Sequence, residues 1–148
     1  MTRISSKISG LCSSASLLFL AASAGAAPIT LQCPAKYPDL IQMRALVMQG
    51  WSAPFPGIPG AQLKQASVLI GPAEKHGELR GTQLPGGTGE RFNFYGITDQ
   101  VEKWAFCSYD TPAGYARLVY QIPVSGRGCE TRVKRSRGRL VTASLRCH

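Results

Sequence analysis

Apolar and polar residues alternate most clearly in the last third of the chain. The ranges 101–109 and 115–122 are rich in aromatic and β-branched residues, and the segment 110–114 between them has the composition of a turn. This pattern predicts an antiparallel hairpin, with Trp104 and Phe106 on one face of its first strand. In its second strand the two expected faces are Ala116, Leu118, Tyr120 and Ile122 against Arg117 and Gln121.

A second hairpin is predicted between Cys129 and Cys147, because Gly138 at its centre can adopt the positive φ that a tight turn needs. Alternation assigns to the cysteine face Thr131, Val133, Val141, Ala143 and Leu145. The remaining basic residues of the hairpin fall on the opposite face, Arg132, Lys134 and Arg146, or around the tip, Arg135, Arg137 and Arg139.

In the preceding part of the chain, Pro and Gly recur every few residues and favour short strands joined by turns. The strands expected there cover 29–33, 62–70, 76–80 and 91–95. The range 39–49 fits a short helix capped by Asp39, and a strand is the alternative. The ranges 51–60, which holds three prolines, and 84–89 are expected to be loops.

These elements predict an all-β fold, a small antiparallel sandwich or partly open barrel with one short helix at most. The side chains expected in the core are Trp104, Phe106, Leu118, Tyr120, Ile122, Val133, Val141 and Leu145.

The first 26 residues have the features of a secretory signal peptide. Arg3 and Lys7 give a positive start, the run 8–22 is apolar or small, and 24–26 (Ala-Gly-Ala) offers a cleavage site after Ala26. The uncharged run is too short and too diluted by Ser and Gly for a membrane anchor. The mature chain is then 27–148, enough for one domain, and no second stretch is long enough to span a membrane.

Cleavage would also remove Cys12 and leave four cysteines, Cys33, Cys107, Cys129 and Cys147. An even number in an exported chain indicates disulfides, and four cysteines allow three connectivities. The second hairpin brings Cys129 to Cys147, so the hypothesis is a Cys129–Cys147 bridge and, by elimination, a Cys33–Cys107 bridge.

The positive charge is concentrated at the end of the chain. The net charge of +9 falls to +7 without Arg3 and Lys7, and the segment from Arg127 onward holds seven basic residues against Glu130. Any electrostatic function is therefore expected in the second hairpin.

Several short motifs together resemble a family of small, uncharacterised exported proteobacterial proteins. The motifs are Leu31-Gln32-Cys33-Pro34, Gly50-Trp51, Trp104-Ala105-Phe106-Cys107-Ser108-Tyr109, Ile122-Pro123, Cys129 and Leu145-Arg146-Cys147. The resemblance covers nearly all of the mature chain, and the spacing of the last three cysteines is its most specific part. It implies a periplasmic or secreted location in a Gram-negative bacterium and brings no catalytic residues.

No motif predicts catalysis, a metal or a cofactor. The mature chain has two histidines, His76 in a charged stretch and His148 at the end, and no Gly-x-Ser-x-Gly elbow. The cysteines lack the Cys-x-x-Cys spacing of zinc sites, and the Gly-rich range 84–91 lacks the Gly-Lys-Ser/Thr ending of a phosphate loop.

Two surface candidates remain. The basic hairpin is either a charged edge that prevents strand pairing or a patch for polyanions, and its lack of aromatic residues disfavours nucleic acid. Trp51 and Phe55 are either partner anchors on a proline-stiffened loop or, the interpretation favoured here, a cap on the core.

The favoured function is a non-enzymatic binding protein of the cell envelope, of the inhibitor or immunity type, acting on a protein partner. The first alternative is a protein that binds an acidic glycan or lipid through the basic hairpin. A small envelope hydrolase is the least favoured, because no acid, base or nucleophile constellation is apparent.

Overall fold

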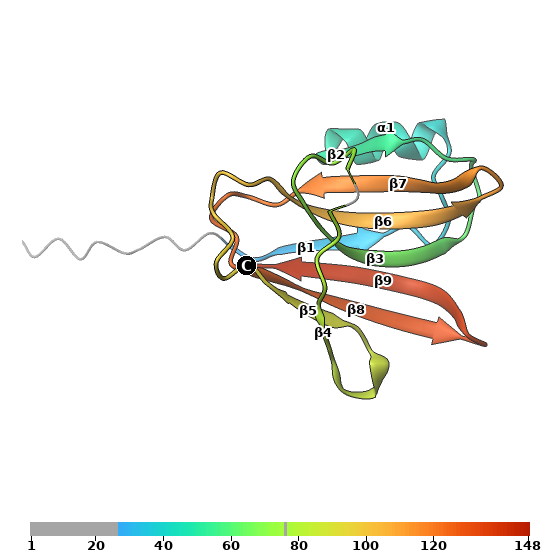
Figure 1. The fold of residues 1–148 in the computed structure, drawn as a ribbon. Coiled ribbons are helices and arrows are strands. Elements are labelled where there is room, and N and C mark those ends of the chain that lie inside the picture. The colour runs from blue at the N-terminus through green and yellow to red at the C-terminus, as the bar shows by residue number, and fades with distance from the viewer. Residues whose placement is uncertain (1–26, 76) are drawn as a thin grey trace, which may run out of the picture.

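The computed structural model describes residues 27–75 and 77–148. The predicted signal peptide, 1–26, and His76 lie outside the described residues. The described chain forms two antiparallel sheets and one α-helix (Figure 1).

The five-stranded sheet has the order β1-β9-β8-β5-β4. Its strands are β1 (Ile29–Cys33), β4 (Thr82–Gln83), β5 (Glu90–Asn93), β8 (Gly128–Ser136) and β9 (Arg139–Cys147). A short 3₁₀ turn, Pro85–Gly87, joins β4 to β5. The predicted second hairpin is confirmed, because β8 and β9 pair with Cys129 opposite Cys147.

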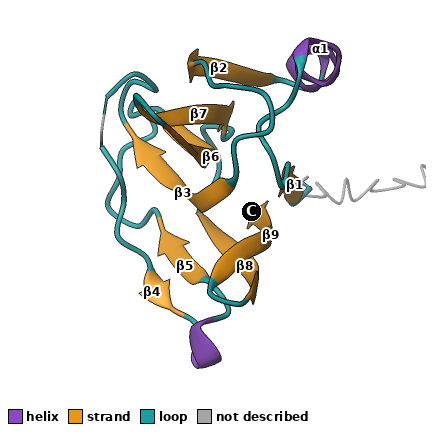
Figure 2. Ribbon diagram, turned by 90° about the vertical axis from the view of Figure 1, so that its right-hand side faces the viewer, coloured by secondary structure: helices purple, strands orange, loops and turns teal. Residues whose placement is uncertain are grey.

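The four-stranded sheet has the order β2-β7-β6-β3. Its strands are β2 (Trp51–Phe55), β3 (Leu63–Ile70), β6 (Lys103–Thr111) and β7 (Gly114–Gln121). The predicted first hairpin is confirmed as β6–β7, with a turn shortened to the two residues between Thr111 and Gly114. The two sheets face each other without closing into a barrel, so the predicted all-β sandwich class is confirmed (Figure 2).

The ambiguous range 39–49 forms helix α1 (Leu40–Met48). Asp39 caps it: its carboxylate accepts a 2.8 Å hydrogen bond from the Gln42 amide, and the Gln42 side chain accepts from the Asp39 amide. The helix lies outermost, beside β2 and away from the five-stranded sheet (Figures 1 and 2).

Two predictions about individual segments are wrong. The range 51–60 begins with strand β2 rather than a loop. β2 pairs only with β7, so it is an edge strand, where Pro54 needs no ladder partner for its missing N–H. The strand predicted at 76–80 is reduced to a single bridge between Leu69 and Glu78.

The core lies between the sheets, and part of the predicted list belongs to it. Leu118, Ile122 and Leu145 are buried there, and Tyr120 and Val133 pack partly buried against it.

Val141 was expected in the core but is 39% exposed. The register shifts between the pairs Lys134–Thr142 and Arg135–Leu140, so β9 has one extra residue at this point. This β-bulge turns Leu140 inward in place of Val141.

Phe106 is fully buried, but on the other face of the four-stranded sheet. There it forms a small second cluster with Leu69, Ala73 and Val119, against which Trp104 packs. The first hairpin is therefore covered on both faces, which alternation alone does not predict.

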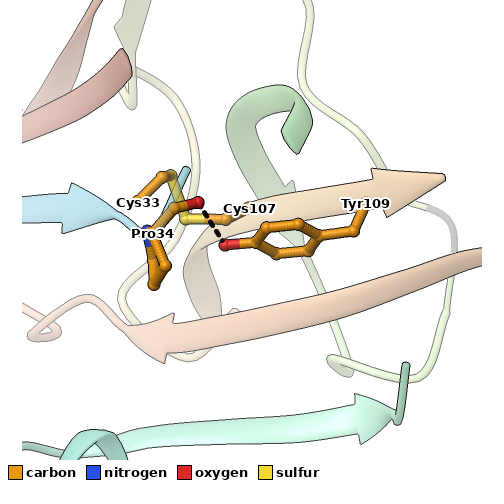
Figure 3. Close-up of a disulfide and its surroundings, with 4 residues drawn as sticks. All are labelled: Cys33, Pro34, Cys107 and Tyr109. Carbon is orange, nitrogen blue, oxygen red and sulfur yellow. Dashed lines mark hydrogen bonds between the residues drawn. A yellow bond between two sulfur atoms is a disulfide. The ribbon is translucent and has the colours of Figure 1, made fainter. Parts of the chain in front are cut away.

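Both predicted disulfides are present. Cys33–Cys107 links β1 to β6, and Cys129–Cys147 crosses the β8–β9 hairpin (Figure 3 shows the first). The first bridge crosses from one sheet to the other, with a Cα–Cα distance of 5.8 Å, and the second joins two residues opposite each other in a hydrogen-bonded pair, at 4.0 Å. Disulfides are characteristic of proteins outside the reducing cytosol.

Candidate functional site

Most basic residues of the second hairpin lie on the outer face of the five-stranded sheet. Residues opposite each other in an antiparallel pair project from the same face. Arg146 is opposite Glu130, which is opposite Arg91, so these three form one row across β9, β8 and β5. Arg132 and Lys134 continue the face along β8, with Ser144 and Thr142 opposite them. Arg91, Arg132, Lys134 and Arg146 are all exposed, and their strand neighbours on this face are polar.

We call this surface the basic face and define it as Arg91, Arg132, Lys134 and Arg146, with Arg137 and Arg139 at its tip. In Figure 1 the β8–β9 tip diverges from the four-stranded sheet.

Glu130 neutralises part of the basic face. Its two carboxylate oxygens accept from Arg91 at 3.1 Å and from Arg132 at 2.6 Å. The hydrogen bonds from Arg91 and Arg132 hold the pKa of the Glu130 carboxyl below its usual value. Among the described residues, no ion pair engages Lys134 or Arg146.

The tip of the hairpin places a strained arginine at the surface. Ser136 pairs with Arg139, so the turn consists of Arg137 and Gly138 alone. Both have positive φ, 49° and 76°, as a type I′ turn requires. Arg137 is the one non-glycine residue with positive φ in the described chain. Asn or Gly would be favoured at this position, so the chain holds a cation at the tip against local backbone preference.

Arg135 does not belong to the tip, where the sequence had suggested it. It is opposite the buried Leu140, and it lines a hollow together with Thr131 and Val133 on the inner side of β8. The hairpin thus presents cations on two sides.

Trp51 and Phe55 are both drawn into packing. Trp51 is 4% exposed, and its ring meets that of Tyr120 edge-on at 5.7 Å. Phe55 is partly buried and lies edge-on to Tyr115 at 5.7 Å. Trp51 therefore caps the core, the interpretation favoured from the sequence.

Arg117 is a residue whose role the sequence did not indicate. It is 5% exposed and lies within cation–π distance of Phe106, at 4.5 Å, and of Tyr115, at 5.0 Å. Its Nε and Nη1 have no hydrogen-bond partner among the described residues. Burial lowers the pKa of the Arg117 guanidinium, although Tyr115 and Glu78 oppose this shift. Phe55 lies 5.8 Å away on the same side. Alternation within one strand does not reveal this setting, because the three rings come from strands β2, β6 and β7.

Helix α1 carries an exposed apolar stripe along one side. At 3.6 residues per turn, Val47, Leu40, Arg44, Met48 and Ile41 fall within an arc of about 120°. Leu40 and Met48 are 81% and 89% exposed, and the other three are exposed as well. Arg44 lies at the centre of this arc.

The described residues do not bring metal-binding groups together. No three of their His, Cys, Asp or Glu side chains are placed to hold a metal ion. No described helix has the length and apolar character needed to cross a bilayer.

These features define a two-sheet, disulfide-linked β domain whose most charged surface is the outer face of one sheet. Comparison of the chain with protein-family models, with curated proteins and with solved structures found no match.

Proposed function

We propose that this chain is an exported, non-enzymatic binding protein of the cell envelope that holds a polyanionic glycan or glycolipid on its basic face. The signal peptide and the periplasmic or secreted location are part of this proposal, and the two disulfides support them. The observation that carries the proposal is the continuous polar face with its exposed cations on three neighbouring strands.

The spacing of these cations suits a charged polymer. Neighbouring strands lie about 4.8 Å apart, and residues two apart along a strand are separated by about 7 Å. Arg132 and Lys134 stand two apart on β8, and Arg146 lies on the neighbouring strand β9. Such a grid can contact successive anionic groups of one chain, whereas it has no aromatic platform for nucleobases.

Retention on immobilised heparin and on lipopolysaccharide tests the proposal. Replacing Arg132, Lys134 and Arg146 with Ala should lower the salt concentration needed for elution and reduce the salt dependence of binding by about three charges. The control variant replaces Lys36, Arg44 and Lys75, which are exposed and lie off the basic face, and has the same net charge. Equal loss of retention in both variants would show that binding depends only on the net charge of the protein, and would reject the basic face as a specific binding site.

A protein partner is the second candidate, in keeping with an inhibitor or immunity protein, and helix α1 favours it. An arginine surrounded by exposed Leu, Ile, Val and Met has the composition of a binding hot spot, where apolar neighbours exclude water from a central charge. The partner would present an apolar groove with a carboxylate opposite Arg44.

A photo-crosslinking residue at position 48 in the native host tests this candidate. A specific protein adduct should form, and Arg44→Glu should abolish it while Arg44→Lys preserves part of it. A crosslinker at Thr88, which is exposed in the turn between β4 and β5 of the other sheet, is the control position. If the same adducts form whatever the charge at position 44, a protein partner that binds helix α1 through Arg44 is not supported.

A further inference from the structure

A polar groove separates strand β3 from the β4–β5 hairpin. It consists of two adjoining hollows, of about 350 and 450 Å³, which share Gln65 and Glu90 in their walls. Their size is in the range of small-molecule sites, but their walls carry more polar groups than the predominantly apolar lining typical of such sites. β3 and β4 are edge strands of different sheets, so the groove lies where the two sheets fail to join.

Each edge strand supplies an amide that is paired with a carboxylate. The Gln65 side-chain amide on β3 donates to Glu78, and the Gln83 side-chain amide on β4 donates to Glu90. Each of these bonds uses one of the two amide N–H donors. The amide oxygen, the second N–H and the other carboxylate oxygen are the groups that a ligand can address. The pairing also fixes the orientation of both amides before a ligand arrives.

The charges around the groove are close to balance. Glu78 and Glu90 are offset by Arg80, Arg135 and Lys64, and Lys64 is itself paired with Asp110 at 2.7 Å. A strongly charged ligand would therefore meet groups of both signs, and an apolar ligand would leave these polar groups without partners. A ligand whose groups both donate and accept hydrogen bonds satisfies amides and carboxylates together.

We propose that this groove binds an uncharged, hydroxyl-rich segment of a saccharide, held by the Gln65–Glu78 and Gln83–Glu90 pairs. Neighbouring hydroxyl groups of a sugar ring can donate to the carboxylate and accept from the amide of one pair. Arg135 extends the groove along the inner side of the β8–β9 hairpin, so a glycan with sugar rings in the groove could place an acidic group at Arg135. This wider assignment rests on the proposed function, whereas saccharide binding in the groove does not.

Titration of the full mature chain with two neutral probes, chitotetraose and maltotetraose, tests the inference by ¹H–¹⁵N NMR. At least one tetramer should shift the side-chain amide signals of Gln65 and Gln83. The affinity should be insensitive to salt, because no net charge is neutralised. The variant with Gln65→Ala and Gln83→Ala should bind about thirtyfold more weakly, since it loses at least two hydrogen bonds at about 1 kcal/mol each. The control variant replaces Gln32 and Gln121, which are exposed on strands outside the groove.

The outcomes separate this inference from the proposed function. If the Gln65→Ala, Gln83→Ala variant (the groove variant) loses binding of the neutral tetramers and keeps its heparin retention, saccharide binding in the groove is supported. Neutral binding that survives in the groove variant, or no shift at Gln65 and Gln83 with either tetramer, overturns it. Loss of heparin retention in the basic-face variant with neutral binding intact leaves both proposals standing. If the basic-face variant keeps its heparin retention while the neutral tetramers still bind in the groove, the proposed function alone is rejected.

Discussion

The hydroxyl group of Tyr109 donates a 3.0 Å hydrogen bond to the carbonyl oxygen of Pro34, two residues along β6 from the Cys33–Cys107 bridge (Figure 3). Tyr109 is fully buried, and its ring meets that of Tyr37 edge-on at 5.3 Å. The bond satisfies a phenol that would otherwise lie unpaired in the core. It also fastens the segment after β1 to the middle of the four-stranded sheet, beside the covalent link.

Tyr109→Phe should lower the free energy of unfolding by about 1 kcal/mol, because it removes this bond and keeps the ring. Urea denaturation followed by circular dichroism measures the change. Tyr95→Phe is the control, since Tyr95 is 94% exposed and its substitution should leave the midpoint unchanged. Equal stability of Tyr109→Phe and the parent chain would contradict the importance of the bond.

Tyr109 should also make stability depend on alkaline pH. Burial raises the pKa of its phenol above the ordinary value of 10.0, and the nearby Tyr37 adds to the shift. Below pH 10 the phenol is neutral in both states. Above it, the unfolded chain ionises while the folded chain resists, so the free energy of unfolding falls as pH rises towards the folded pKa. Comparing urea midpoints on either side of pH 10 should show a smaller alkaline loss for Tyr109→Phe than for the parent chain.

The two disulfides should differ in their effect on stability. Cys33 and Cys107 are separated by 74 residues, and Cys129 and Cys147 by 18. A crosslink that closes a longer loop restricts the unfolded chain more, with loop-entropy estimates of about 4.5 and about 3 kcal/mol for these two loops. Replacing the first pair with Ala should therefore lower the urea midpoint more than replacing the second. The reverse order would show that the hairpin bridge acts chiefly on the folded state.

The hairpins and disulfides could be predicted from the sequence because each depends on local spacing. Alternation and the central Gly138 locate the second hairpin, and the hairpin then brings Cys129 to Cys147. The side of each residue was harder to predict. One extra residue in β9 exposes Val141, and no feature of composition marks that bulge.

The basic face could be predicted as a cluster of charge, but the groove and the burial of Arg117 could not. The groove lies between β3 and the β4–β5 hairpin. These elements belong to different sheets, so only the packing of the two sheets brings Gln65 and Gln83 together. Alternation along β7 places Arg117 on the face of the sheet that points away from the main core. Residues distant in sequence, such as Ala73 and Phe106, cover this face and bury the arginine.

Gly89 should be intolerant of any side chain. A Cβ atom at this position would lie 1.9 Å from the carbonyl oxygen of Thr131 on β8. Gly89→Ala should therefore lower the free energy of unfolding by about 2–3 kcal/mol, because the β4–β5 hairpin must move away from β8. Gly87→Ala is the control: Gly87 has a φ of 65°, and a Cβ there meets nothing within 4 Å, so only backbone strain of about 1 kcal/mol is expected. Thermal unfolding of the two variants compares them directly, and similar losses would show that the close approach to Thr131 relaxes easily.

Arg137→Asn should raise stability and weaken polyanion binding at the same time. Arg137 has a φ of 49°, and Asn adopts this left-handed region more readily, so the free energy of unfolding should rise by about 0.5–1 kcal/mol. Heparin retention should fall, because one exposed cation is lost from the tip of the basic face. Arg139→Asn is the matched control: it removes the same charge from the neighbouring strand, where φ is not positive, and should weaken retention without the gain in stability. A gain in stability with unchanged retention would place the binding surface away from the tip and leave the strained arginine without a functional reason.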